Sequence, residues 1–529
     1  MFKRILTTAA ILGACLALTP VPGFADEFQV TVDAGALSGL ASRDGLVRSF
    51  KGIPYAAAPV GALRWRPPEP VAAWQGTREA NRFASICPQP APKPGVFYQR
   101  EFFQTAEPQS EDCLYLNVWT AAPAGAAPRP VMVFFHGGGW SRWSGSMPSL
   151  DGSTLARKGA IVVTFNYRLG AFGFLAHPEL NAESPNHVSG NYGLLDQIAA
   201  LRWVQANIAA FGGDPKRVTI FGQSAGATAV AYLTASPLAK DLFRRAIIES
   251  SSMAAGTAFQ GPTGPLAKAE ERGKQLVADL GAPSIAALRT MPAAEVMTRL
   301  LPKFDTLGLV PVIDGWLLKT DIPGVIAAGQ QNNVELMIGS TANEASVFFP
   351  PLAPEALQTV IQKWFGPQAE PIAALYKGTD LDTATVANDQ LRSDYVAATA
   401  RVMARASAQH GHPAWVFSFD RPAPGSDPVK AGAFHCAELA YVFGTQNTID
   451  RPWEAFDRQL SDVMSSYWVR FAETGNPNGP NLPEWPAYDG QQGQVKVFGT
   501  RASPGPGLKA APLLEAFIAT RLAPDSGGR

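Results

Sequence analysis

Ser224 lies in the sequence Gly222-Gln223-Ser224-Ala225-Gly226, which has the spacing of a nucleophile elbow. A serine hydroxyl can attack a carbonyl carbon when a tight strand-to-helix turn lifts its oxygen clear of the backbone. Glycines two residues before and two after the serine allow that turn. An apolar run precedes the serine and small residues follow it. The pattern predicts a nucleophile. The alternative is a glycine-flanked serine in an ordinary turn, which would have the same sequence.

A glycine run over 136–140 (His-Gly-Gly-Gly-Trp) follows another apolar segment. Glycine leaves backbone N–H groups unobstructed, so that they can converge on the oxyanion formed when a hydroxyl attacks a carbonyl. Losing one such donor typically costs about 3–4 kcal/mol of transition-state stabilisation. Together with the N–H of Ala225, this loop predicts an oxyanion hole, and a flexible loop is the alternative. We expect His136 to order the loop rather than to act as a base.

The general base must be one of six histidines, His136, His177, His187, His410, His412 and His435. A serine in such an elbow is followed along the chain by an acid and then by the base, which leaves His410, His412 and His435. His410 and His412 begin a strand-like run, and no nearby acid supports a metal site there. His435 lies in a loop of small residues after that run. A lone histidine is usually structural, but its place in this order makes His435 the expected base.

The acid should lie between Ser224 and His435 in a loop that follows a strand. Glu344 meets this condition, because an apolar run over 334–338 leads into the small, polar residues before it. Asp314 is a second candidate, and it could equally cap a turn. The spacing of residues does not choose between these two carboxylates.

Short, β-branched apolar runs that stop at glycine or polar residues predict strands buried on both faces. They cover residues 131–135, 160–165, 217–221, 246–251, 334–338 and 415–419. Helices are predicted over 194–208 and directly after Ser224. This alternation predicts an α/β fold with a large, mostly parallel central sheet covered by helices on both faces. The segments 254–328 and 354–408 are expected to be mostly helical insertions.

The composition indicates a globular protein with a large core and no excess of charge of either sign. The 529 residues are 46% hydrophobic and 17% charged, and 44 Lys and Arg balance 44 Asp and Glu. Such a chain can bury a large core. The balanced charge gives no reason to expect nucleic acid or an anionic membrane as a partner. The oligomeric state stays open.

The N-terminus predicts an export signal. A basic start and an apolar core over 5–18 precede Ala25, a small residue where a leader peptidase can cleave. We expect residues 1–25 to be a signal peptide and 26–529 to form a single domain, secreted or periplasmic. The alternatives are a lipoprotein anchored through Cys15 and an ordinary buried helix. No other apolar stretch reaches the roughly 18 residues that a transmembrane segment needs.

Further motifs stand in order along the chain, at 50–56 (Phe-Lys-Gly-Ile-Pro-Tyr-Ala), 63–68, 110–119, 166–170, 190–197, 211–215 and 474–478. With the segments around His136 and Ser224, they resemble the type-B carboxylesterase (cholinesterase-like) family over nearly all of the mature length. The resemblance implies the α/β-hydrolase fold. It also implies a serine carboxylester hydrolase that works by two-step acyl transfer, without a metal or an organic cofactor.

The resemblance also implies the role of each candidate residue. It places the nucleophile on Ser224, the base on His435 and the acid on Glu344 rather than Asp314. It places the oxyanion donors on Gly138, Gly139 and Ala225. It further implies a disulfide between Cys87 and Cys113 and an ion pair between Arg64 and Glu111 beside it. A non-catalytic adhesion or binding protein on the same scaffold loses members of the triad, and here all three are present.

Three departures from the family bear on the substrate. Gln223 stands where many members have glutamate. The segment 101–109 lacks the tryptophan that cholinesterases use to stack on a quaternary ammonium. Cys436 stands where relatives commonly carry glycine, and we expect it to be a small buried residue. We therefore expect small to medium neutral carboxylic esters, or anionic ones, rather than choline esters. A hydrolase specialised for detoxification or catabolism would share this triad.

Overall fold

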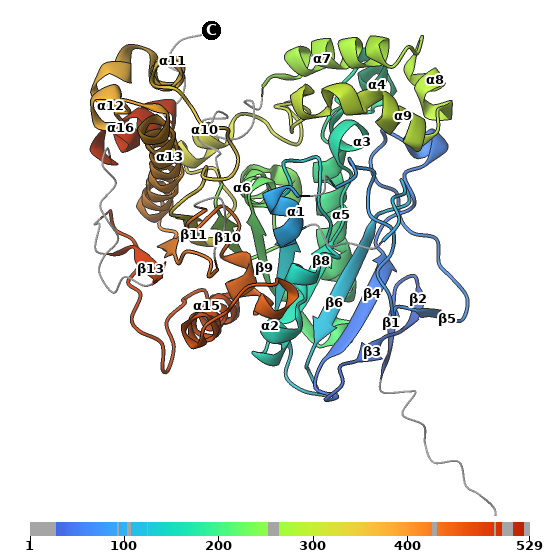
Figure 1. Cartoon of the computed structure of the whole chain (residues 1–529). Coiled ribbons are helices and arrows are strands. Elements are labelled where there is room, and N and C mark those ends of the chain that lie inside the picture. The colour runs from blue at the N-terminus through green and yellow to red at the C-terminus, as the bar shows by residue number, and fades with distance from the viewer. Residues whose placement is uncertain are drawn as a thin grey trace, which may run out of the picture.

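The computed structural model describes residues 28–92, 95–102, 107–123, 125–251, 264–425, 431–490, 494–499 and 511–522. The centre of this part of the chain is a ten-stranded sheet (Figure 1). In spatial order its strands are β13 (Lys496–Gly499), β12 (Ala414–Asp420), β11 (Glu335–Thr341), β10 (Arg245–Glu249), β9 (Gly213–Gln223), β7 (Arg129–Phe135), β8 (Ile161–Phe165), β6 (Tyr115–Thr120), β4 (Arg48–Pro54) and β3 (Leu40–Ala41). Neighbouring strands from β13 to β8 pair in parallel. The remaining neighbours pair antiparallel, β6 with β8, β4 with β6, and β3 with β4. The predicted fold class is confirmed.

Each central strand contributes side chains to two hydrophobic cores, one on either face of the sheet. Side chains alternate between faces along a strand. In β7, Val131, Val133 and Phe135 therefore pack into one core, and Met132 and Phe134 pack into the other. All five side chains are buried, which explains the unbroken apolar run in the sequence.

Helices cover both faces, as the sequence predicts. On one face lie α5 (Tyr192–Asn207), α6 (Ala225–Ala235) and the 29-residue α13 (Leu381–Gln409), which share a core with alternate strand residues. On the other face lie α2 (Ser153–Arg157), α14 (Leu439–Val442) and α15 (Ala455–Thr474). The sheet is therefore enclosed, and its strand ends are positioned by two well-packed layers.

The described parts of the two insertions are mostly helical, as predicted. The first holds α7 (Leu266–Asp279), α8 (Ile285–Thr290), α9 (Ala293–Leu300) and α10 (Ile322–Ala327), although a stretch without helix separates α9 from α10. The second holds α11 (Pro354–Phe365), α12 (Ala369–Leu375) and most of α13. In Figure 1, α7, α8 and α9 lie at the upper right, and α11 and α12 lie at the upper left, near α16 (Ala511–Leu522). Each group has its own small hydrophobic core.

Strands β1 (Gln29–Val32), β2 (Gly35–Ser38) and β5 (Thr77–Glu79) form a separate small sheet. Cys87 and Cys113 are joined in a disulfide. Beside it, Arg64 donates through Nε and Nη2 to the two carboxylate oxygens of Glu111, at 2.6 and 2.5 Å. The described residues include no helix with the length and apolarity needed to cross a membrane. The predicted signal segment 1–25, with Cys15, lies outside the described residues.

Candidate active site

Ser224 occupies the turn between β9 and α6, with a φ of 60° and a ψ of −124°. Such a conformation is unusual for a residue with a Cβ and costs about 1–3 kcal/mol, so the surrounding structure must hold it. The Ser224 N–H donates to the carbonyl of Glu249 at the end of β10, at 3.0 Å. The turn thereby keeps the serine at the end of the sheet, as the elbow pattern predicts.

The two flanking glycines are required by close backbone contacts. A Cβ on Gly222 would lie 2.7 Å from the carbonyl carbon of Gly226. A Cβ on Gly226 would lie 1.9 Å from the carbonyl oxygen of Phe135, at the end of β7. Strand and helix can therefore approach this closely only if both residues lack a side chain.

His435 and Glu344 form a buried hydrogen-bonded pair. Nδ1 of His435 is bonded to Oε2 of Glu344, and the side chains are 2% and 0% exposed. Oε1 of Glu344 accepts from the Thr341 N–H at 2.8 Å, and the Glu344 N–H donates to the hydroxyl of Ser393 at 2.9 Å. The carboxylate therefore holds the proton on Nδ1 and leaves the lone pair on Nε2 as an acceptor.

The competing acid, Asp314, is a turn cap. Its Oδ1 accepts from the N–H groups of Trp316, Leu317 and Leu318 at 2.9–3.0 Å. Its Oδ2 accepts from Asn191 at 2.9 Å. These bonds use the carboxylate to order a loop, so Asp314 is not available to orient His435.

His136 lies in the core below the glycine loop. Its ring stacks on Tyr167 with the ring centres 4.3 Å apart, and the Tyr167 hydroxyl donates to the His136 carbonyl at 2.8 Å. Burial lowers the pKa of His136 to about 4. The residue is therefore neutral at physiological pH and orders the loop. His410 and His412 lie at the end of α13, and within the described residues no group of three metal-ligating side chains occurs.

The glycine loop runs directly beside the elbow. A Cβ on Gly137 would lie 2.8 Å from the Gln223 carbonyl oxygen, and a Cβ on Gly138 would lie 2.3 Å from the Arg142 carbonyl oxygen. Gly138 and Gly139 both have positive φ, 89° and 63°. At the first residue of α6 the backbone N–H has no intrahelical acceptor, because four N–H groups at a helix start are unpaired. The glycine loop and the start of α6 therefore both offer backbone N–H donors beside Ser224.

A glutamine that sequence analysis missed holds the far end of this loop. Oε1 of Gln89 accepts from the Trp143 N–H at 2.8 Å, and its Nε2 donates to the Trp143 carbonyl at 3.0 Å. The same Nε2 donates to the carbonyl of Cys87 at 3.1 Å. Gln89 therefore connects the disulfide segment to the glycine loop. Nothing in the sequence around it signals this contact, which spans 54 residues.

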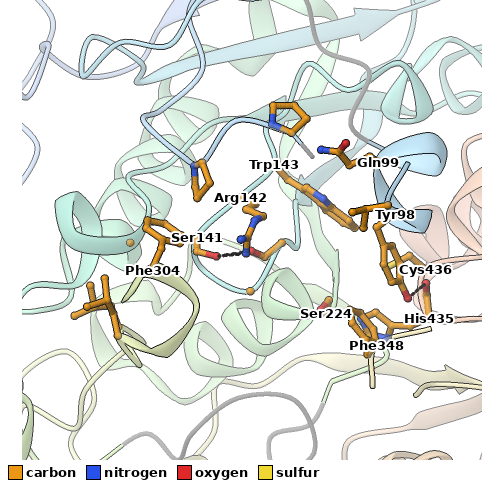
Figure 2. A pocket seen from close by; sticks show the side chains of 18 of the residues that line it. Tyr98, Gln99, Ser141, Arg142, Trp143, Ser224, Phe304, Phe348, His435 and Cys436 are labelled. Atoms are coloured by element: carbon orange, nitrogen blue, oxygen red, sulfur yellow. Dashed lines mark hydrogen bonds between the residues drawn. The ribbon is translucent and has the colours of Figure 1, made fainter. Parts of the chain in front are cut away.

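A cavity of about 640 Å³ opens onto the elbow. Figure 2 shows Ser224, His435 and Phe348 at one end of it and Ser141 and Phe304 at the other. Its further lining residues include Tyr98, Gln99, Arg142, Trp143, Leu307, Leu309, Val310 and Cys436. An indole therefore does line the cavity, although the segment 101–109 has none: Trp143 comes from the end of the glycine loop. The absence of tryptophan from 101–109 does not leave the cavity without one.

Several buried polar groups lie around His435. Nε2 of Gln223 lies 3.2 Å from Nε2 of His435, and Oε1 of Gln223 accepts from the Cys436 thiol at 2.9 Å. Cys436 is buried, as expected, and its φ of 78° explains why glycine suits this position. Burial raises the pKa of the thiol well above its usual range, so it stays protonated.

Two fully buried carboxyl groups also lie near Gln223 and Cys436. They belong to Glu249 and Glu438, which the sequence did not single out. Oε1 of Glu249 accepts from the indole N–H of Trp468 at 2.6 Å. Burial raises the pKa of Glu249 to about 8. Burial, and then the neighbouring Glu249, raise the pKa of Glu438. Both side chains are therefore neutral at pH 7, a state that the sequence alone does not reveal.

The chain is similar to known esterases over almost its whole length. The sequence model of the carboxylesterase family matches residues 26–509. Fumonisin B1 esterase of Sphingopyxis macrogoltabida is 38% identical over 93% of this chain and 91% of that protein. Para-nitrobenzyl esterase of Bacillus subtilis is 38% identical over 87% of this chain and 92% of that protein. A solved structure of PNB esterase superposes with a TM-score of 0.77 at 34% identity, covering 92% of this chain and 100% of the other.

Proposed function

Because the chain belongs to the carboxylesterase family and is a carboxylic ester hydrolase, we propose that Ser224, His435 and Glu344 carry out ester hydrolysis through an acyl-enzyme. The observation that carries this proposal is the buried bond between Nδ1 of His435 and Glu344, at the end of the cavity where the strained Ser224 lies. A nucleophile, a base and an orienting acid within one cavity are what acyl transfer requires.

In the first step, Nε2 of His435 takes the proton from the Ser224 hydroxyl as its oxygen attacks the ester carbonyl carbon. Glu344 keeps the imidazole in the right tautomer and stabilises it once it is protonated. The negative oxygen is held by the N–H groups of Gly138, Gly139 and Ala225. The imidazolium then gives its proton to the departing alcohol, and the acyl group stays on Ser224.

In the second step, water attacks the acyl-enzyme. His435 takes a proton from the water, the tetrahedral intermediate again places its negative oxygen on the backbone donors, and the Ser224 oxygen leaves with the proton from the imidazolium. The carboxylic acid is released and the enzyme is regenerated. This route uses only protein groups and water, so the proposal includes no metal or organic cofactor.

The substrates proposed are small to medium neutral carboxylic esters. A cavity of about 640 Å³ is of the size that holds a compact organic molecule. Its wall is rich in apolar side chains such as Phe304, Leu307, Leu309 and Val310. Gln223, whose amide lies 3.2 Å from Nε2 of His435, is neutral and supplies no negative charge that would attract a quaternary ammonium group. Acetylcholine should therefore be hydrolysed more slowly than a neutral aryl ester. The named relatives make fumonisin B1 and para-nitrobenzyl esters useful additional probes.

A burst assay tests the catalytic proposal. With p-nitrophenyl acetate, the wild type should release one equivalent of p-nitrophenol per active site before, or together with, steady turnover. Ser224→Ala should lower kcat by several orders of magnitude. Ser141→Ala removes a hydroxyl from the same cavity and serves as the matched control. If Ser224→Ala is no slower than Ser141→Ala, the assigned nucleophile is wrong.

Export from the cytoplasm is proposed on separate grounds. The disulfide between Cys87 and Cys113 suits an oxidising compartment, in agreement with the signal peptide predicted over 1–25. N-terminal sequencing of the processed protein should begin at Asp26, with 26–529 forming one domain. A processed chain that begins at a lipidated Cys15 would instead establish the lipoprotein alternative.

A further inference from the structure

Asp389 lies on α13, and its carboxylate contacts the loop that carries Glu344, the acid loop. Its Oδ1 accepts from the Ala345 N–H at 2.9 Å. One turn further along the helix, the Ser393 hydroxyl accepts from the Glu344 N–H at 2.9 Å and donates to the Asp389 carbonyl at 2.8 Å. Neither Asp389 nor Ser393 is among the described residues that line the cavity. Two successive N–H groups of the acid loop are therefore bonded to the same turn of one helix.

The other carboxylate oxygen of Asp389 is linked to the loop that carries His435, the base loop. Its Oδ2 accepts from Nδ2 of Asn343 at 3.1 Å. Oδ1 of Asn343 accepts in turn from the N–H of Ala433, which precedes His435 in the base loop, at 3.1 Å. The Asn343 N–H also donates to the Ala433 carbonyl at 3.1 Å. The side chain of Asn343 therefore connects α13 to the base loop.

The two neighbours of the Asn343 amide fix its orientation. An ionised carboxylate only accepts hydrogen bonds and a backbone N–H only donates, so the NH2 group faces Asp389 and the amide oxygen faces Ala433. The amide also lies close to the base loop, because a Cβ on Gly432 would lie 2.2 Å from Oδ1 of Asn343. Gly432 has a φ of 62°, which a residue without a side chain adopts at no steric cost. The contact between the two loops is therefore both close and directional.

From these contacts we propose that Asp389 is a positioning residue for the reaction, because its carboxylate holds the acid loop and the base loop against α13. This inference rests on the proposed function, since Asp389 acts only through Glu344 and His435. Glu344 must meet Nδ1 of His435 while Nε2 faces Ser224. A displacement of about 1 Å at a reacting group can lower the rate about 100-fold. Asp389 therefore sets how accurately the acid and the base are aligned.

The test exchanges the two polar side chains that make the link. In Asp389→Asn the side chain has a single acceptor oxygen, so if it keeps the bond to Ala345 its NH2 group faces the NH2 group of Asn343. In Asn343→Asp two carboxylates face each other. The double variant Asp389→Asn/Asn343→Asp again pairs a donor with an acceptor, with the direction of the bond reversed. It also keeps the acceptors for the N–H groups of Ala345 and Ala433.

We expect each single variant to lower kcat for p-nitrophenyl acetate by about 10- to 100-fold with little change in KM, because the cavity wall is untouched. The double variant should recover most of the lost kcat. Asp394→Asn is the matched control, because Asp394 lies on the same helix and accepts from Tyr376 and Gln390 at 2.7 and 2.6 Å. It should lower the melting temperature without a comparable loss of kcat.

A purely structural role of Asp389 would reduce the fraction of active protein and leave kcat per active site unchanged. Titration of the active sites with a fluorophosphonate separates the two quantities. Two results would overturn the inference while leaving the proposed function intact. One is a kcat per active site that falls no further in the single variants than in Asp394→Asn. The other is a double variant that is no faster than the single variants.

Should Asp389→Asn fail to fold, Asn343→Asp and the double variant give the same comparison, because Asn343→Asp breaks the link at its other end. If the wild type does not hydrolyse p-nitrophenyl acetate, the proposed function itself is wrong.

Discussion

The side-chain amide of Gln223 lies 3.2 Å from Nε2 of His435, the atom proposed to take the proton from the neighbouring Ser224. Since Nδ1 of His435 is bonded to Glu344, Nε2 carries the lone pair and the Gln223 amide donates to it. In the proposed mechanism the serine hydroxyl must use this same acceptor, so the Gln223 amide would have to give it up when Ser224 reacts.

Replacing this amide with a carboxylate should change the pH dependence of catalysis. In Gln223→Glu an anion would face Nε2 and favour the protonated imidazole, which cannot act as a base. The acid limb of the kcat/KM profile for p-nitrophenyl acetate should move to higher pH by about one unit or more. Gln99→Glu places the same charge elsewhere in the cavity wall and is the control. A profile for Gln223→Glu that matches the control would show that the amide does not influence His435.

The buried Glu249 should reduce stability as pH rises. Its pKa is raised from 4.5 to about 8 in the folded chain, so between these values the folded state holds a proton that the unfolded state has lost. The free energy of unfolding therefore falls with increasing pH across this window. Glu249→Gln cannot ionise and removes the decline.

We expect Glu249→Gln to match the wild type near pH 4.5 and to be increasingly more stable up to pH 8. The difference should grow by at most about 1.4 kcal/mol per pH unit. Denaturant unfolding at pH 5, 6, 7 and 8 measures it. Glu271→Gln, on the exposed face of α7, is the control. A stability difference that is the same at every pH would contradict a raised pKa for Glu249.

Gln89 should matter for the rate although it does not line the cavity. Gln89→Met keeps the side-chain length but loses both bonds to the Trp143 backbone. The glycine loop should then hold its N–H donors less accurately, lowering kcat on the order of tenfold with a smaller change in KM. Gln205→Met loses two similar bonds to backbone carbonyls away from the loop, and it should have little effect on kcat. Equal kinetics for the two variants would exclude this role.

The sequence predicts those features that follow from local pattern. The six predicted strands are present, because residues buried on both faces leave an unbroken apolar run, as in β7 and β8. The elbow is predictable because Gly222 and Gly226 leave no room for a Cβ. Order along the chain reduced the six histidines to His410, His412 and His435, and the strand-like run that begins at the first two favoured His435 as the expected base. Spacing did not choose between Asp314 and Glu344, and the three N–H groups bonded to Asp314 explain why only one of them is free to orient a base.

What the sequence could not predict depends on contacts between distant segments. Gln223 and Cys436 are 213 residues apart, and their bond beside His435 has no local signature. The protonation of Glu249 depends on burial beneath α15, where Trp468 lies, rather than on its own β10 neighbours. The place of Arg142 in the cavity depends on insertion residues such as Phe304. Substrate selection therefore depends on residues that only the three-dimensional structure brings together.

The measurement that tests the central claim most directly is labelling with a fluorophosphonate, read by mass spectrometry of the intact chain and of its peptides. We expect one adduct per chain, located on Ser224. It should be absent from Ser224→Ala and should form much more slowly in Glu344→Gln, since His435 would then lose its orienting carboxylate. An adduct on another residue, or undiminished labelling of Ser224→Ala, would contradict the claim that Ser224 is the nucleophile.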